Sequence, residues 1–263
     1  AAFTYAAPLE AFPKARAAAQ KALQLDESLA EAHTSLGVIT LLHDWDWPTA
    51  EREHLRALEL DSGYPTGHSW YSFCLMAVGR VEEALAEQEL ARVLDPMSLM
   101  INTLSGAALY YARRFDEARD RLLKTVDMDP NFGTAYSYLG LALEQLSLHD
   151  DAIARLHGAR ALMDLPMVVA HLAHAYAVAG RGDEGRELLL ELDGMSTQRY
   201  VSPFHVAAVH VGLGDHDQAL TWLAKAIADR DAWVQYLARD PRFDPLHTDS
   251  RFTKLLIEVD AGV

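Results

Sequence analysis

The chain has 263 residues, half of them apolar and 23% charged, a composition typical of a folded protein rather than a disordered one. Its net charge of −15 argues against nucleic-acid binding, because nucleic acids are bound through clustered Lys and Arg. The single cysteine, Cys74, excludes an internal disulfide framework and favours a reducing compartment such as the cytoplasm. No run approaches the length of apolar sequence that a membrane span needs, so no membrane association is predicted.

The first residues, 1–13, contain Pro8 and Pro13 and show no sustained period, so we expect an N-terminal connector there. The chain begins A-A-F-T-Y, without Met and without a basic, apolar leader. We therefore expect it to be part of a longer polypeptide. From residue 14 onward, apolar residues recur at steps of three and four, which is the helical period.

An internal repeat of 33 to 35 residues dominates the rest of the sequence. Its copies start at Glu10, Trp45, Gly79, Arg113, Ser147, Gly180 and Gly214. The sixth position of the copies is occupied by Ala15, Ala50, Ala84, Ala118, Ala152, Gly185 and Ala219. Such a repeat predicts a stack of similar units, in which each unit buries its apolar surface against its neighbours.

Each unit predicts two helices joined by a short polar turn. Residues 134–146 and 150–162 show the pattern, with apolar side chains in phase along one face of each helix. Gly106 and Gly140 in first helices, and Ala84 and Ala118 in second helices, are expected where two helices cross closely. We predict one half repeat and six full repeats over residues 14–231. The period then breaks, and residues 232–263 are predicted to cap the open end with an amphipathic helix.

This pattern resembles the tetratricopeptide repeat, which has the same length, two helices, small residues at the helix crossing and a closing Pro. The helix pair over residues 134–162 matches it well, and the preceding pair adds Gly106, Leu122 and Pro130. The resemblance covers residues 14–231 and implies an all-α fold, a right-handed α-solenoid with a concave inner groove. It also implies a protein–protein interaction module rather than an enzyme.

A second resemblance concerns the strings H-D-W-D-W-P-T-A-E at 43–51 and R-D-P-R-F-D-P-L-H-T-D-S-R-F at 239–252. They resemble tetratricopeptide regions that follow a kinase, winged-helix or cyclase domain in bacterial signalling proteins. None of those effector domains is in this sequence. Trp45 and Trp47 could form an aromatic recognition box. We favour the alternative, in which their side chains pack at the corner of a unit that is one residue longer.

The groove that the resemblance implies is the best functional lead. If the family's phase holds, its wall is apolar and aromatic with hydroxyl groups at the rim, suited to an amphipathic helix or an extended peptide. The Asn and Lys with which some family members clamp a terminal carboxylate are missing. Tyr110, Tyr111 and Phe73 are the expected anchors, because large aromatic residues dominate binding energy. The candidate groove residues are Thr34, Val38, Ser69, Phe73, Met76, Tyr110, Tyr111, Ser137, Leu141 and His174. The alternative is that half of them pack between helices.

No catalytic, metal-binding or cofactor-binding motif was found. The twelve His include His171 and His174 on one predicted helix, yet no three or four ligands converge in the pattern that zinc needs. An enzyme with a His-bound metal is therefore a remote alternative. A second alternative to partner binding is a structural, self-associating element that forms a homo-oligomer.

Overall fold

Helices make up nearly all the regular structure in the computed structural model, which describes residues 6–260. A lone helix, α2 (Pro8–Leu25), is followed by six helix pairs, and no strand occurs in these residues. The pairs are α3 (Ala30–Ile39) with α4 (Trp47–Leu60), α5 (Pro65–Ala77) with α6 (Val81–Leu94), α7 (Leu99–Tyr111) with α8 (Phe115–Met128), α9 (Gly133–Gln145) with α10 (His149–Leu162), α11 (Pro166–Val178) with α12 (Gly182–Ser196), and α13 (Pro203–Gly212) with α14 (His216–Ala228). The predicted all-α array of helix pairs is confirmed.

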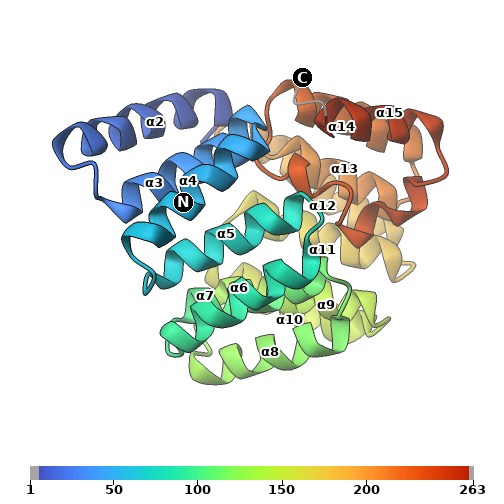
Figure 1. Ribbon diagram of the computed structural model, residues 1–263. Coiled ribbons are helices and arrows are strands. Elements are labelled where there is room, and N and C mark those ends of the chain that lie inside the picture. The colour runs from blue at the N-terminus through green and yellow to red at the C-terminus, as the bar shows by residue number, and fades with distance from the viewer. Residues whose placement is uncertain (1–5, 261–263) are drawn as a thin grey trace.

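The first helix of each pair belongs to an inner layer and the second to an outer layer. Each first helix packs against the next first helix, as α5 does with α7 and α7 with α9. Most residues of the first helices are buried, whereas the second helices bury a narrow stripe and expose their charged residues. Figure 1 shows the pairs following one another in a curved array, so that the earliest and latest helices lie near each other.

The first helix begins earlier than the sequence predicts. We expected a connector over residues 1–13, but α2 starts at Pro8, so this expectation is wrong for residues 8–13; residues 1–5 lie outside the described part. Pro8 occupies the first helical position, where its missing N–H costs nothing. Pro13 lies inside the helix, and its neighbour Phe12 is buried and stacks on His43 with ring centroids 5.3 Å apart. That packing offsets the hydrogen bond that Pro13 cannot make.

A left-handed residue ends the first helix of every pair. The residues with positive φ at this place are Trp45, Gly79, Arg113, Ser147, Gly180 and Gly214. The chain then reverses direction. In the second pair, for example, the backbone N–H of Arg80 donates to the carbonyl oxygen of Leu75 at 2.9 Å. Glycine, which adopts this conformation without strain, is present in half of these turns, and Arg113 and Ser147 adopt the conformation without it.

The one longer repeat is accommodated by a π-helical turn. The first copy is 35 residues long, and its extra residue is taken up where α3 continues into a π-turn, η1 (Thr40–Asp44). The turn ends at Trp45, which carries the left-handed φ of 60° found at this position in the other units. The second helix then starts in register, with the Asp46 carboxylate accepting from Thr49 N–H at 3.1 Å.

The small residue at the sixth repeat position lies at the crossing of each helix pair. Ala50, Ala84, Ala118 and Ala152 are completely buried there. In the sixth copy, a Cβ at Gly185 would lie 3.0 Å from the backbone oxygen of Ala173. Close backbone contact therefore explains both the run of Ala and its one replacement by Gly.

The residues after α14 do not continue the array. We call residues 231–249 the return segment. It contains two short 3₁₀ helices, η2 (Val234–Tyr236) and η3 (Pro241–Leu246), which pack on α5 and α13 respectively. In Figure 1 the segment lies between the end of α5 and α13. Only the following helix, α15 (Ser250–Asp260), packs on α14 at the end of the array, so the region predicted as a cap divides into two parts.

The return segment also joins the two ends of the array. Trp45 is 3% exposed and shares a buried cluster with Phe204, Val234 and Leu237. The guanidinium of Arg230 lies 4.1 Å from the centre of the Trp45 ring. Trp45, from the string at 43–51, thus fills a corner shared by the first and last pairs.

Candidate functional site: the inner face and its return segment

Two of the three aromatic residues expected as partner anchors contact Tyr236 of the return segment. The Tyr236 ring stacks on Tyr111, with centroids 5.1 Å apart, and meets the edge of Phe73 at 6.0 Å. Tyr111 is 3% exposed and Phe73 is 5% exposed. This part of the predicted groove is therefore covered by the chain itself, and Tyr111 faces a residue of its own chain rather than solvent.

A buried ion pair holds the middle of the return segment against Tyr110. Arg242 Nη2 donates to Asp240 Oδ2 at 2.6 Å, and the Tyr110 hydroxyl donates to Asp240 Oδ1 at 3.2 Å. All three side chains are almost completely buried. Burial opposes ionisation of Asp240, but the Arg242 charge and its hydrogen bonds outweigh burial and lower the pKa of Asp240. An exposed bidentate pair, Arg113 with Asp244, adds a second link to the same region.

Two copies of the sequence D-x-R-F form the same local structure, one buried and one at the surface. In each copy the Asp carboxylate accepts from the backbone N–H of the Arg and from its guanidinium. The copy at Asp240 is buried, whereas the copy at Asp249 is on the surface. The following Phe243 and Phe252 are both buried and their rings stack. The repeated string therefore anchors two aromatic side chains.

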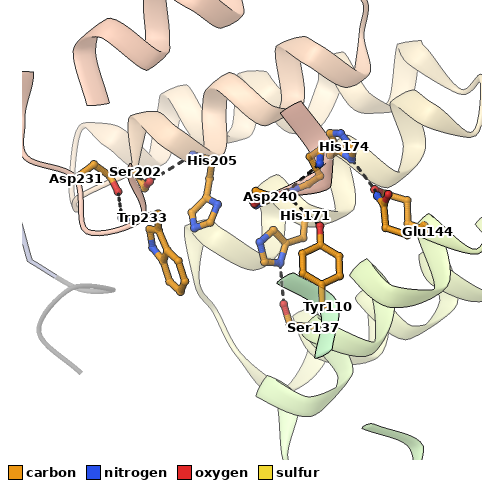
Figure 2. Close-up of polar contacts among 12 residues, drawn as sticks. Tyr110, Ser137, Glu144, His171, His174, Ser202, His205, Asp231, Trp233 and Asp240 are labelled. Atoms are coloured by element: carbon orange, nitrogen blue, oxygen red, sulfur yellow. Dashed lines mark hydrogen bonds and ion pairs between the residues drawn. The ribbon is translucent and has the colours of Figure 1, made fainter. Parts of the chain in front are cut away.

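The start of the return segment is fixed by Asp231. Its carboxylate accepts from the Ser202 hydroxyl at 2.6 Å, from the Tyr200 hydroxyl at 2.9 Å and from Trp233 N–H at 3.0 Å. Burial raises the pKa of Asp231, in spite of these hydrogen bonds. Figure 2 shows Asp231, Ser202 and Trp233 gathered at this end of the segment.

Buried histidines form the wall beyond the ion pair. His171 Nδ1 is 2.9 Å from the Ser137 hydroxyl, and the His171 and His205 rings meet edge to face at 5.1 Å. Burial and then the Arg242 charge lower the pKa of both His171 and His205 well below the usual value. His174 pairs with Glu144 at 2.9 Å, as Figure 2 shows. Between residues 6 and 260 no three His, Cys, Asp or Glu are placed to hold a metal ion.

Several of the predicted groove residues pack inside the inner layer. Met76 and Leu141 are buried in the main core cluster, against which Val38 packs half-buried. Thr34 is 3% exposed, and the Ser69 hydroxyl donates to Gln88 at 3.0 Å. The alternative reading, in which part of this set packs between helices, therefore describes these residues well.

An apolar pocket remains open beside the return segment. Its volume is about 460 Å³, and the predicted groove residues Ser69 and Phe73 line it together with Trp233 and Tyr236. The other lining residues are Leu42, Thr66, Trp70, Ser98, Met100, Ile101, Leu104, Thr134, Tyr138, Met163, Leu165, Met167 and Ala232. The structure thus brings Ser69 and Phe73 to an open site and leaves Tyr110 and Tyr111 outside it.

Sequence reasoning missed the residues that the return segment contributes. Tyr236, Asp240 and Arg242 lie beyond the last repeat, where we expected a cap. A signal was present in the string A-W-V-Q-Y-L-A at 232–238, which is too apolar for an exposed connector. The repeat period cannot assign such a segment to a face, since the segment has no counterpart in the other units.

A second cavity, of about 830 Å³, lies between the start of α2 and helices α12 and α14. Leu9 and Leu190 line it and are 55% and 74% exposed. Its cationic residues Arg186, Arg199 and Lys225 are each paired with an Asp. The cavity therefore presents apolar surface, and these three cations are paired.

The lone thiol is a packing residue. Cys74 is 2% exposed, and burial raises its pKa to about 12. A thiol in this state is a poor nucleophile, because the thiolate is the reactive form. In the same part of the chain, residues 6–260, no helix has both the length and the apolar character of a membrane span.

No family model and no curated protein matches the chain. Solved structures do resemble it. The APC/C hetero-tetramer Cut9–Hcn1 gives a TM-score of 0.63 at 15% identity, over 94% of this chain and 46% of that one. PilF of Pseudomonas aeruginosa gives 0.56 at 20% identity, over 89% and 98% of the two chains. TTC0263, a thermophilic TPR protein of Thermus thermophilus, gives 0.53 at 21% identity, over 87% and 99%. At these identities the likeness shows the fold.

Proposed function

We propose that this chain, which has the tetratricopeptide-repeat fold, is a protein–protein interaction module that binds a segment of a partner in the open pocket of its inner face. The observation that supports the proposal is the pocket of about 460 Å³ at Trp70, Leu104 and Trp233. Pockets of this size with mostly apolar walls and a few hydroxyl groups are typical binding sites. Three of its hydroxyl groups come from Thr66, Ser98 and Thr134 at the starts of three successive first helices.

The three expected anchors have two different roles in this proposal, partner binding and contact with the return segment. Phe73 has one side against Tyr236 and also lines the open pocket, so it remains a candidate partner contact. Tyr110 and Tyr111 contact the return segment and therefore stabilise the fold rather than bind a partner. The partner therefore reaches the part of the groove between α5 and α11, bordered by Trp233. A placement within a larger bacterial regulatory protein remains part of this proposal, on the two resemblances described above.

Selection from an unbiased library of displayed peptides tests this function. Selected peptides should lose at least about tenfold in affinity when Met100→Arg places a charged side chain at the pocket, because burying an unpaired charge is costly. Met100 is 47% exposed, so the change leaves the core intact. Met128→Arg, at an exposed Met of the outer helix α8, is the matched control and should bind as the unmodified protein does. No enrichment, or equal binding by both variants, contradicts the proposal.

Self-association is the second candidate. The exposed Leu9 and Leu190 at the larger cavity favour it, because apolar surface of this kind marks interaction sites. Sedimentation equilibrium at rising protein concentration separates the two candidates. A monomer at every concentration removes self-association and leaves peptide binding as the function.

A further inference from the structure

The open pocket is continuous with an interface that the chain already makes with itself. Trp233 and Tyr236 form one wall of the pocket, and the same two residues lie in the return segment, which fills the neighbouring part of the inner face. The return segment therefore shows what kind of sequence this inner face accepts. It is a short, irregular stretch that carries aromatic side chains and arginines.

The inner layer has an unusual distribution of charge. None of the six first helices, α3, α5, α7, α9, α11 and α13, contains a Lys or Arg. Each of the six second helices contains at least one. The cations at the inner face come instead from the return segment and the residue before it. Arg230 lies over Trp45, Arg239 lies against Gly79, and Arg242 is buried with Asp240.

The edge at which the pocket opens is also without positive charge of its own. The turns that precede α5, α7 and α9 contain Asp61, Asp95 and Asp129, and no Lys or Arg. Asp164, in the next turn, is paired with Arg199 and adds no net charge. Residues of these turns and of the following first turns line the pocket, among them Ser98. The lining of the pocket thus contains no charged residue, and the turns that lead into it carry carboxylates without cations.

We propose that the pocket binds an aromatic or large aliphatic side chain of a partner protein, in a segment that carries Lys or Arg on either side of it. This inference rests on the proposed function and specifies the chemistry of its partner. Met100, Met163 and Met167 in the wall adapt to the shape of the inserted side chain, since Met is flexible and polarisable. The flanking cations complement Asp61, Asp95 and Asp129, which favours fast association and the correct partner.

Three synthetic peptides test the inference. They share one central Trp between two Leu and differ only in flanking residues, which are Lys and Arg, Ser, or Asp and Glu. Titration calorimetry should show the basic peptide binding at least about tenfold tighter than the neutral one, and the acidic one weakest. The difference should shrink as salt is raised, because exposed charges are screened. Met100→Arg should abolish binding and Met128→Arg should not.

A variant with Asp61→Asn, Asp95→Asn and Asp129→Asn tests the source of the preference. Asn keeps the acceptor oxygen that the Gly63 and Asn131 backbone N–H groups use in these turns, so the fold should be retained. The variant should bind the basic and neutral peptides with nearly equal affinity. If the neutral or acidic peptide binds as tightly as the basic one, and Met100→Arg still removes binding, the inference is wrong and the peptide-binding function stands. If none of the three binds and the library selection also fails, both are wrong.

Discussion

His54 fills a place that leucine fills in other repeats. Gly37 lies opposite its ring, so that a Cβ there would be 2.8 Å from His54 Nε2. In the third and fourth pairs the same place is taken by Leu122 against Gly106 and by Leu156 against Gly140. Both ring nitrogens of His54 are buried without a hydrogen-bond partner. Burial lowers its pKa to about 4, because the charged imidazolium would lose its hydration.

We predict that His54→Leu makes the stability less sensitive to acid. The unfolded chain takes up a proton near pH 6.5 and the folded chain near pH 4, so below pH 6.5 the proton favours unfolding. Between pH 7 and pH 5 the cost from this residue is about 2 kcal/mol. Urea unfolding at the two pH values should show a loss of stability that is smaller by about this amount in the variant, while buried His171 and His205 cause the same loss in both proteins. His157→Leu, at an exposed His, is the control. An unchanged pH dependence in His54→Leu contradicts the assignment.

At the scale of elements, the helix crossings are set by the smallest side chains. A Cβ added at Gly106 would lie 2.4 Å from Leu122 Cγ, and one added at Gly140 would lie 2.5 Å from Leu156 Cγ. Gly194 is also helical, in α12, but nothing lies within 4 Å of the position of its Cβ. The two kinds of glycine therefore differ in packing while sharing the same weak helix propensity.

Alanine at these positions should change stability in opposite directions. Gly106→Ala gains up to about 1 kcal/mol in helix propensity but overpacks the pair, at a cost of about 1–3 kcal/mol. Gly194→Ala keeps the gain without the clash. The midpoints of urea unfolding should fall for the first variant and rise for the second. Two shifts of the same sign would show that close contact does not decide the crossing.

The array of helix pairs could be predicted from the sequence because each pair needs the same residue types at the same positions. The Ala at the crossing and the turn after the first helix recur every 33 to 35 residues, so one copy confirms another. The return segment could not be placed this way. Its contacts with Tyr110 and Tyr111 join residues far apart in the chain, and no other unit repeats them.

The covering of the predicted groove could not be read from the sequence for the same reason. The family phase places Phe73, Tyr110 and Tyr111 on the inner face, and they do lie under the return segment there. The pattern of one helix cannot show whether the surface it predicts is already covered. The open pocket requires the return segment to be placed first, because Trp233 and Tyr236 form its wall.

For the whole molecule, the return segment converts an open array into a closed one. Tyr236 and Asp240 contact α5 and α7, while Arg230 and Leu237 meet Trp45 at the other end of the chain. This closure requires that residues 231–249 lie against the inner layer.

A double-mutant cycle on Tyr111 and Tyr236 tests that claim directly. The two rings stack with centroids 5.1 Å apart, and aromatic pairs of this kind contribute about 0.5–1.5 kcal/mol beyond the area they bury. The free energy of unfolding is measured for Tyr111→Ala, for Tyr236→Ala and for both together. We predict that the double variant loses less stability than the sum of the two single variants, by about 0.5 kcal/mol or more. Additive losses would mean that the two residues are not in contact and that the return segment does not occupy the groove.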